Sequence, residues 1–233
     1  MLISAFGLCL QTPSVEAEYE LLLEMKVDES LVAVGESVNF TLTLKNIGTE
    51  NVTIFFSPPL FDLFYWTAEG CFRWSDGKFF ILIVIELELE ANETHTETLQ
   101  WDLCQYKEEK YTPPEPREYK LIGTCHPAGV ISQDPAKIIV TYCSDVNKDL
   151  KVDIQDLTIV AIAFGSKRGD PSWNPTADLD KSNAVNIIDV TVAAKDYGKS
   201  LHPPLLSEWY SVCWIEHGTG LQLWRATVLN LTC

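Results

Sequence analysis

Two segments in the carboxyl-terminal half of the chain repeat one pattern of polar and apolar residues. DVNKDLKVDIQDLTIVAIAFGS begins at Asp145, and DLDKSNAVNIIDVTVAAKDYGK begins 33 residues later at Asp178. Acidic or amide side chains recur at the first, third, ninth and twelfth places of both segments, with valine at the eighth place and isoleucine at the tenth. A repeat of this regularity predicts two copies of one supersecondary unit that pack against each other.

Within each segment the oxygen-bearing side chains are spaced as a calcium ion requires. Calcium binds about six to eight oxygen atoms at about 2.3–2.6 Å, and a twelve-residue loop with oxygens at alternate places can surround it. The twelfth residue, at the start of a helix, can supply both of its carboxylate oxygens. We therefore expect two calcium ions. The expected ligands of the first ion are Asp145, Asn147, Asp149, the carbonyl of Lys151, Asp153 (directly or through a water) and Asp156, and those of the second are Asp178, Asp180, Ser182, the carbonyl of Ala184, Asn186 and Asp189.

The sixth place of each loop departs from the glycine that a sharp turn favours. It is occupied by Leu150 in the first loop and by Asn183 in the second. Asparagine tolerates a positive φ, whereas leucine does so at a cost. Since the first loop has the richer set of carboxylates, the sequence leaves open which loop binds calcium more tightly.

The residues that precede each loop distinguish the repeat from a pair of EF-hands, in which a helix enters each loop. Residues 138–142, IIVTY, are strand-like, and residues 169–175 contain two prolines that prevent a long helix. Loop–helix units that lack the entering helix resemble the dockerin repeat, and the connector SKRGDPSWNPTADLD is similar to that of bacterial and archaeal dockerins. The resemblance covers residues 143–200 and implies a module that folds around calcium and docks onto a cohesin domain of another protein.

The docking surface implied by this resemblance is the outer face of one or both helices, which we expect at residues 157–164 and 190–197. In dockerins the tenth and eleventh places often contact the partner, and here these are Ile154, Gln155, Ile187 and Ile188. The alternative is that the apolar residues of both helices form the small core of the module itself. That alternative concerns Leu157, Val160, Ala161 and Phe164, with Val190, Ala193, Ala194 and Tyr197.

The region before the repeats alternates polar and apolar residues, as half-buried strands do. Between Ser37 and Asn46, the apolar residues occupy every second position. Further strands are expected at residues 51–56, 79–90, 96–103, 118–122 and 136–142, separated by turn-rich pieces. Many short strands of this kind predict an immunoglobulin-like β-sandwich. The expected fold is therefore mainly β, with a small α module formed by the two calcium loop–helix repeats.

The same region resembles the BsuPI-type intracellular proteinase inhibitor domain over about 100 residues. The resemblance implies a β-sandwich that binds another protein. The Pro-rich loop at residues 112–116 and a pair of cysteines depart from the family pattern. The shared features are a strand that ends in Lys45-Asn46 before a glycine turn, Phe61-Asp62 followed by an aromatic strand, Gly70 ahead of Arg73-Trp74-Ser75, and an acidic turn leading to a strand that ends at Trp101.

Several features favour export of the chain. Residues 1–17 resemble the last part of a secretion signal, although no basic residue precedes their apolar run. The six cysteines that follow are an even number, which suggests disulfides in an exported protein, and four N-glycosylation acceptors point the same way. We expect a signal segment at 1–17, the sandwich at 18–142, the dockerin-like module at 143–200 and a tail of unassigned structure at 201–233.

Composition and motifs narrow the function to binding. A net charge of -16 argues against a nucleic-acid partner, and the apolar run at the amino terminus is too short to span a membrane. No catalytic motif is present in the sequence, so an enzyme is not expected. We expect a secreted or cell-surface adaptor whose calcium-dependent module docks to a cohesin-like partner. The alternatives are an inhibitor that binds a protease, and a glycan-binding module that holds a polysaccharide on exposed aromatics such as Trp74.

Overall fold

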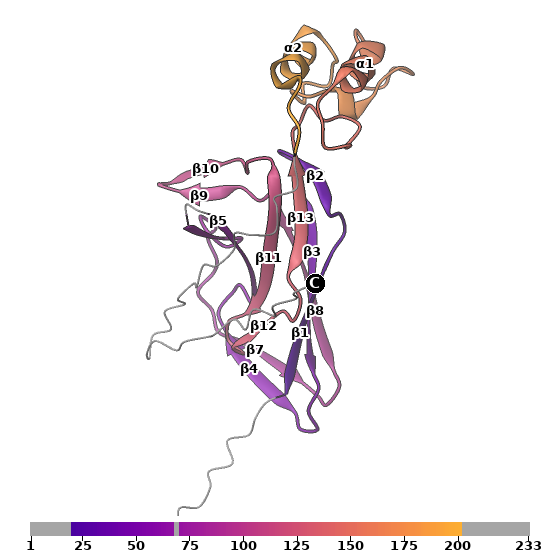
Figure 1. Cartoon of the computed structure of the whole chain (residues 1–233). Coiled ribbons are helices and arrows are strands. Elements are labelled where there is room, and N and C mark those ends of the chain that lie inside the picture. Colours follow the sequence, from indigo (N-terminus) through magenta and orange to yellow (C-terminus); the bar gives the residue numbers. More distant parts are fainter. Residues whose placement is uncertain (1–19, 68–69, 202–233) are drawn as a thin grey trace, which may run out of the picture.

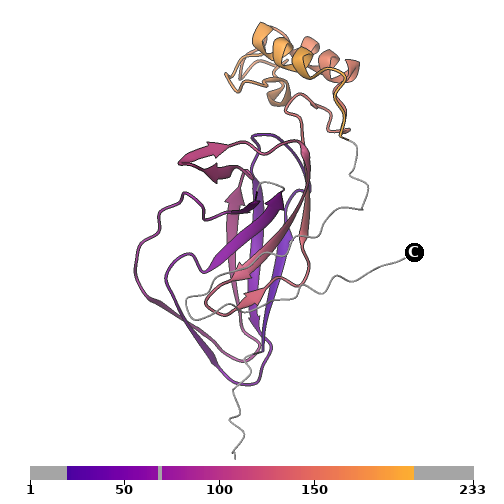
Figure 2. The same cartoon turned by 60° about the vertical axis from the view of Figure 1, so that its left-hand side comes forward.

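The computed structural model describes residues 20–67 and 70–201. Sandwich-like sheets make up most of this part of the chain, and two short helices lie together at one end of the sandwich (Figures 1 and 2). The mainly β fold with a small α module is therefore confirmed. The signal segment expected at residues 1–17 and the tail from residue 202 onward lie outside the described residues.

One sheet is built around strand β3 (Val38–Asn46), which alternates strictly between buried and half-buried residues, as its sequence predicts. It pairs antiparallel with β1 (Leu21–Val27) and with β8 (Thr94–Trp101). On the outer face, threonine hydroxyls of β3 and β8 are hydrogen-bonded across the strands at 3.0 and 3.3 Å. Such cross-strand pairs fix the register of an antiparallel sheet.

A second sheet faces the first, and its strand β13 leads directly into the segment that contains the helices. Its strands run in the order β2-β13-β11-β5-β6, and β12 pairs with the free part of β11. Only the β2–β13 pair is parallel among these neighbours. The strands are β2 (Leu31–Ala33), β5 (Phe61–Thr67), β6 (Gly70–Arg73), β11 (Arg117–Cys125), β12 (Val130–Ile131) and β13 (Ala136–Thr141).

Two further pairs of strands extend from this sandwich. β4 (Val52–Phe56) pairs with β7 (Ile85–Leu89) at the end away from the helices, and β9 (Gln105–Lys107) pairs with β10 (Lys110–Thr112) (Figure 1). Both pairs are antiparallel. The β4–β7 pair extends beyond the two main sheets as a separate two-stranded sheet, so its outer edges pair with no further strand among the described residues.

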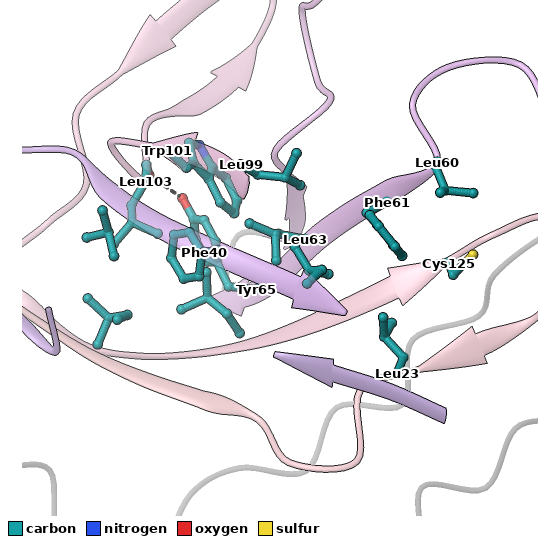
Figure 3. Packing of buried hydrophobic residues seen from close by; sticks show 14 of the residues in the cluster. Leu23, Phe40, Leu60, Phe61, Leu63, Tyr65, Leu99, Trp101, Leu103 and Cys125 are labelled. Atoms are coloured by element: carbon teal, nitrogen blue, oxygen red, sulfur yellow. Dashed lines mark hydrogen bonds between the residues drawn. The ribbon is translucent and has the colours of Figure 1, made fainter. Parts of the chain in front are cut away.

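Aromatic residues fill the space between the main sheets. Tyr65 is fully buried, and its hydroxyl donates a hydrogen bond to the carbonyl of Leu103 at 2.8 Å (Figure 3). Its ring packs against Phe72, Trp101 and Tyr119 at centroid distances of 5.0–5.5 Å. A buried tyrosine of this kind contributes apolar area while its hydroxyl remains satisfied. The aromatic strand following residue 60 therefore belongs to the core.

The strand expected at residues 79–90 is only half correct, because β7 begins at Ile85. Residues 79–84 have no regular structure, and most of their side chains are exposed. The reason lies in the partner strand: β4 ends at Phe56, and the chain continues as Ser57-Pro58-Pro59. Proline has no N–H to donate, so the ladder cannot extend past this point.

The cysteines also differ from expectation. Cys104, Cys125 and Cys143 have free thiols and are not paired with one another. Burial raises the pKa of Cys104 to about 12 and that of Cys125 to about 11, so both thiols stay protonated at neutral pH. Two of the expected six, Cys213 and Cys233, lie outside the described residues.

The two helices are α1 (Ile154–Ala163) and α2 (Ile187–Asp196), with a short 3-10 turn (Pro175–Ala177) between them. Both begin three residues earlier than expected, because a capping box starts each one immediately after the ninth place of its loop. Within the described part of the chain, neither helix has the length and apolar content needed to cross a membrane.

Candidate metal centre

The two predicted loops adopt the same backbone geometry. The fourth and sixth places of both have positive φ: 58° at Lys148 and 70° at Leu150, 56° at Lys181 and 68° at Asn183. Leucine in this region costs about 1–2 kcal/mol. Leu150 nevertheless adopts it, because its N–H donates to the carboxylate of Asp145 at 3.0 Å. The leucine at the sixth place therefore does not distort the first loop.

The aspartate at the first place of each loop is buried and holds the same backbone groups. Asp145 accepts from the N–H groups of the fifth and sixth places at 3.1 and 3.0 Å, and Asp178 does so at 3.0 and 2.8 Å. Burial raises the pKa of Asp145, while hydrogen bonds from Thr141 and from backbone N–H groups oppose this shift. Both loops thus fold around an inward-facing carboxylate.

The aspartate at the twelfth place closes each loop. Asp156 and Asp189 are both fully buried. In each, Oδ1 accepts from the N–H groups of the second and third places at 2.7–3.2 Å, and Oδ2 accepts from the ninth place at 2.7–2.8 Å. A buried carboxylate is costly unless opposite charge or hydrogen bonds compensate it. Backbone N–H groups supply part of that compensation, and a bound cation would supply the rest.

In the second loop three carboxylates converge. One oxygen from each of Asp178, Asp180 and Asp189 lies within 4.8 Å of the others. Two oxygens bound to the same calcium ion at about 2.3–2.6 Å are at most about 5 Å apart, so this triad fits one coordination sphere. Hydrogen bonding by Ser182, whose backbone N–H donates to Asp180 Oδ1 at 3.0 Å, lowers the pKa of Asp180, which keeps that exposed carboxylate charged. The triad could therefore bind a divalent metal ion.

The other predicted ligands of the second loop surround this triad. The carbonyl of Ala184 accepts from Ser182 Oγ at 3.1 Å and from Asn186 Nδ2 at 3.2 Å. Asn186 Oδ1 also accepts from the N–H of Ile188 at 2.8 Å, so the ninth place acts as the helix N-cap. All six predicted residues therefore lie in one connected cluster at the start of α2.

The first loop brings its six residues together in the same way, with an amide at the third place. Asn147 Oδ1 accepts from the N–H of Asp149 at 3.0 Å, while its Nδ2 donates to Asp149 Oδ2 at 3.2 Å. Asp149 Oδ1 accepts from the N–H of Lys151 at 3.0 Å, and Asp153 caps α1. The arrangement matches that of the second loop, although the chemistry differs at three places. The third place here is an amide instead of a carboxylate, and the fifth and ninth places are carboxylates where the second loop has a hydroxyl and an amide.

The two units hold each other through reciprocal backbone hydrogen bonds. Val185, at the eighth place of the second loop, exchanges bonds of 2.8 and 2.9 Å with Gly165 and Ser166 after α1. Val152, at the eighth place of the first loop, exchanges two bonds of 2.8 Å with Gly198 and Lys199 after α2. The shared valines predicted by the repeat are therefore the bridge between the loops, and both are buried.

The helices use only part of their apolar residues for the core of the module. Leu157, Val160, Val190 and Ala193 contribute to it, together with Ala163, Ala177 and Val185. Phe164 and Tyr197 are each 54% exposed, and Ala161 and Ala194 are exposed as well. The interpretation that all eight of these helix residues form the core is therefore wrong for half of them, because they lie on the outward side of their helices.

The predicted partner contacts lie on that outward side. Ile154, Ile187 and Ile188 are 53–65% exposed, and Gln155 is exposed beside them. The tenth places of the two units therefore present equivalent isoleucines at the start of the two helices. Ile162, which is 76% exposed on α1, is an outward apolar residue that the repeat pattern alone did not single out.

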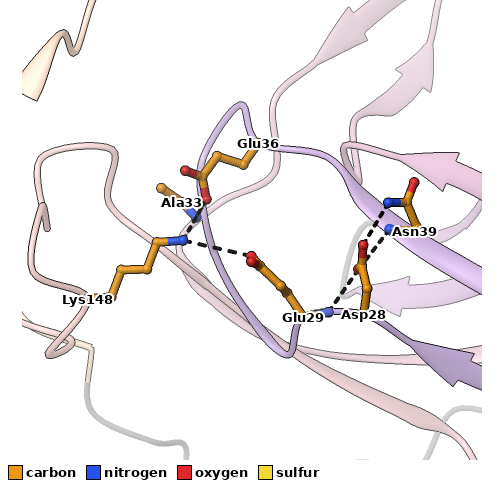
Figure 4. A network of polar contacts seen from close by, with 6 residues as sticks. All are labelled: Asp28, Glu29, Ala33, Glu36, Asn39 and Lys148. Carbon is orange, nitrogen blue, oxygen red and sulfur yellow. Dashed lines mark hydrogen bonds and ion pairs between the residues drawn. The ribbon is translucent and has the colours of Figure 1, made fainter. Parts of the chain in front are cut away.

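Contacts between the loops and the sandwich were not foreseen from the sequence. Lys148 forms ion pairs with Glu36 at 3.1 Å and with Glu29 at 3.9 Å (Figure 4). Lys181 donates to the carbonyl of Gly35 at 2.7 Å. Both lysines occupy the fourth place of their loops, and this shared position is the sequence signal that could have indicated a common role.

A further contact joins the first loop directly to a strand of the sandwich. Thr141, the last residue of β13, donates its hydroxyl proton to the carboxylate of Asp145. The carbonyl of Thr141 in turn accepts from the N–H of Val34 at 3.0 Å, after β2. The first aspartate of the first loop is therefore fixed to the end of a strand of the second sheet.

Comparison with known proteins supports the sandwich assignment. Residues 25–125 match the family described as BsuPI, intracellular proteinase inhibitor, which confirms the resemblance found in the sequence. No curated protein matches the chain. Solved structures that resemble parts of it do so at low identity.

These structures belong to different kinds of protein. A β-glucosidase from Listeria innocua in complex with isofagomine is 16% identical over 54% of this chain and 17% of that one, with a TM-score of 0.36. A CARDB domain from Pyrococcus furiosus in complex with di-metal ions is 15% identical over 53% of this chain and 90% of that one, with a TM-score of 0.31. An alkylpurine DNA glycosylase from Pseudomonas fluorescens bound to DNA is 13% identical over 52% and 30%, with a TM-score of 0.36. This chain thus spans less than a fifth of the β-glucosidase.

Proposed function

Because residues 25–125 match the BsuPI family, we propose that the chain is a non-enzymatic binding protein in which this sandwich is attached to a partner through a calcium-dependent, dockerin-like module. The module binds two calcium ions, one in each loop. Its outward helix faces dock onto a cohesin-type domain. The site of action is outside the cell or on its surface.

The observation that carries this proposal is the equivalence of the two loops. The first-place and twelfth-place carboxylates accept hydrogen bonds from the same backbone places in each, and the positive φ values recur at the same places. Two loops that differ in sequence at several places, among them the third, fifth, sixth and ninth, keep one geometry. A shared ligand explains this, since oxygen placement is what the loops have in common.

Calcium fits the loops better than magnesium does. Magnesium demands a near-ideal octahedron at about 2.0–2.1 Å and retains several waters, whereas calcium accepts a larger and more flexible set of oxygens. Each loop offers carboxylates, an amide or hydroxyl and a backbone carbonyl from six residues. A module with a core of a few small apolar residues would also depend on the ions for its folding free energy.

Calcium titration of the full chain by calorimetry tests this function, with circular dichroism in parallel. We expect about two ions per chain and a rise in helix content on binding. Asp189→Asn should remove the second-loop ion and Asp156→Asn the first, because each closes its own loop. Asp134→Asn, at an exposed position of the sandwich, is the matched control and should leave two ions bound. A wild-type chain that binds no calcium would sink the proposal.

The partner is tested separately with cohesin domains immobilised on a surface. Binding should require calcium and should be lost with EDTA. Ile154→Glu together with Ile187→Glu should abolish it without changing the calcium stoichiometry, since both isoleucines are exposed. Calcium binding without capture by any cohesin would retain the metal sites and reject the partner.

A second candidate function is inhibition of a protease by the sandwich, and the BsuPI family match favours it. Assays of the full chain against bacterial serine proteases would detect it. The glycan-binding alternative gains no such support. The indole N–H of Trp74 donates to the carbonyl of Gln100 at 2.8 Å, and the ammonium group of Lys78 lies 3.5 Å from its ring centroid. The indole N–H of Trp74 and one face of its ring are therefore already occupied by groups of the sandwich itself.

A further inference from the structure

The segment FFILIV, residues 79–84, is the largest exposed apolar stretch in the described part of the chain. Phe79 and Leu82 are 101% and 94% exposed, and Val84, Ile81 and Ile83 are 76%, 68% and 47% exposed. Phe80 is half-buried and packs against Trp74 at a ring-centroid distance of 5.9 Å. Contiguous apolar surface of this kind marks an interaction site rather than scattered exposure.

The backbone of this segment is also open. Among the described residues, its one backbone hydrogen bond runs from the N–H of Ile83 to the carbonyl of Ile81 at 3.1 Å, which closes a tight turn at Leu82. β7 continues directly from it at Ile85, where its ladder with β4 begins at Phe56. Residues 79–84 therefore lead into β7 beyond the end of its partner strand without forming a strand themselves. Once the bond between Ile83 and Ile81 opens, their N–H and C=O groups can pair with another strand.

From this open edge we infer that a second copy of the chain pairs with it, antiparallel, around a two-fold axis at Leu82. The distribution of charged residues supports a second copy of the chain as the partner. Residues 79–85 carry no charge in a chain of net charge -16, and the charged residues that flank them are Lys78 and Glu86. Each lies four positions from Leu82, so a two-fold ladder centred there places Lys78 of one copy opposite Glu86 of the other, twice.

The surroundings of the segment are compatible with such a ladder. Phe55 of β4 is 62% exposed and lies opposite Glu86 in the β4–β7 ladder, so its side chain extends the apolar face toward the second copy. The chain leaves the described part at Leu201, beside the helices, whereas β4 and β7 lie at the opposite end of the sandwich (Figures 1 and 2). The proposed ladder therefore lies at the end of the sandwich away from the helices.

Sedimentation equilibrium of the calcium-loaded full chain over a concentration series tests the dimer. We expect a reversible monomer–dimer equilibrium. Leu82→Glu should weaken it about a hundredfold or more, because it removes a buried leucine from both copies and sets two carboxylates opposite each other. Ile131→Glu, at another exposed apolar position (54%), is the matched control and should leave the equilibrium unchanged.

Charge reversal tests the register. Lys78→Glu and Glu86→Lys should each weaken the dimer about three- to tenfold, since each sets like charges opposite each other at two places. The double variant should restore it. A monomer at all concentrations, open-ended assembly, a dimer insensitive to Leu82→Glu, or a double swap that fails to restore association would each overturn the proposal.

Discussion

At the scale of single residues, the sixth place of the first loop shows how hydrogen bonds can hold a disfavoured backbone conformation. Leu150 takes a φ of 70°, although leucine is disfavoured there. Its N–H is held by Asp145 at 3.0 Å, and its carbonyl accepts from the N–H of Leu201 at 2.8 Å. The geometry of the first loop therefore includes backbone strain at Leu150 that a glycine would remove.

Leu150→Gly is accordingly expected to tighten calcium binding in the first loop. Removal of about 1 kcal/mol of strain corresponds to roughly fivefold in the dissociation constant. The measurement is calorimetry in an Asp189→Asn background, in which only the first loop can bind. Asn183→Gly in an Asp156→Asn background is the matched change in the second loop and should give a smaller gain, since asparagine tolerates positive φ. Unchanged or weaker binding by Leu150→Gly would show that strain does not limit this loop.

At the scale of elements, the sequence predicts what depends on local pattern and misses what depends on distant partners. The alternation from Val38 to Asn46 predicts β3 because every second residue must face the core. The repeat predicts both loops, because their oxygen-bearing residues recur at fixed places, and it marks the valine that the two loops share at the eighth place. Residues 79–84 have equal β-forming character but no strand, because their pairing is decided by Pro58 and Pro59 on another segment.

The turn between β6 and residue 78 is held by a contact with β5 that no local sequence pattern predicts. Asp62 of β5 is 3% exposed and accepts from Ser75 Oγ and from the N–H of Ser75 at 3.1 Å. It thereby anchors this turn to the second sheet. Desolvation raises the pKa of Asp62, and the hydrogen bonds from Ser75 and from the N–H of Leu63 oppose this shift.

Asp62 should therefore give the sandwich a specific pH dependence. Its pKa in the folded state lies above its ordinary value, so between these two pKa values the folded chain holds a proton that the unfolded chain has lost. The stability contribution of Asp62 is thus largest at low pH and falls as the pH rises through the folded pKa. Denaturant unfolding of the wild type and of Asp62→Asn between pH 7 and pH 4 measures it. Wild type should gain stability relative to the variant as the pH falls, and a constant difference would contradict this cause.

At the scale of the whole molecule, the loop–helix module and the sandwich are joined by a short connection and by side chains of the loops. β13 ends at Thr141, only a few residues before Asp145. Lys148 and Lys181 both contact the turn after β2, and the ion pair of Lys148 with Glu36 links residues 112 positions apart. A sequence read locally could not foresee these contacts, because nothing near either lysine indicates Gly35 or Glu36.

These contacts predict that calcium controls how the module is held on the sandwich. Both lysines have positive φ within a calcium loop, so a loop that opens without the ion would withdraw them. Small-angle scattering should show a broader distribution of dimensions in EDTA than in calcium. Lys148→Ala with Lys181→Ala should broaden the distribution even in calcium, although each exposed ion pair is worth only about 1 kcal/mol or less.

Two ions should still bind the double variant, since neither lysine side chain is a ligand, and calorimetry checks this. Lys195→Ala, on the exposed side of α2, is the control and should scatter as the wild type does. The scattering is compared in the Leu82→Glu background, so that dimer formation does not obscure the result. If EDTA and the double variant both leave the scattering unchanged, the lysines do not hold the module. Its position would then depend on Thr141 and the short connection to β13, which remain in every variant.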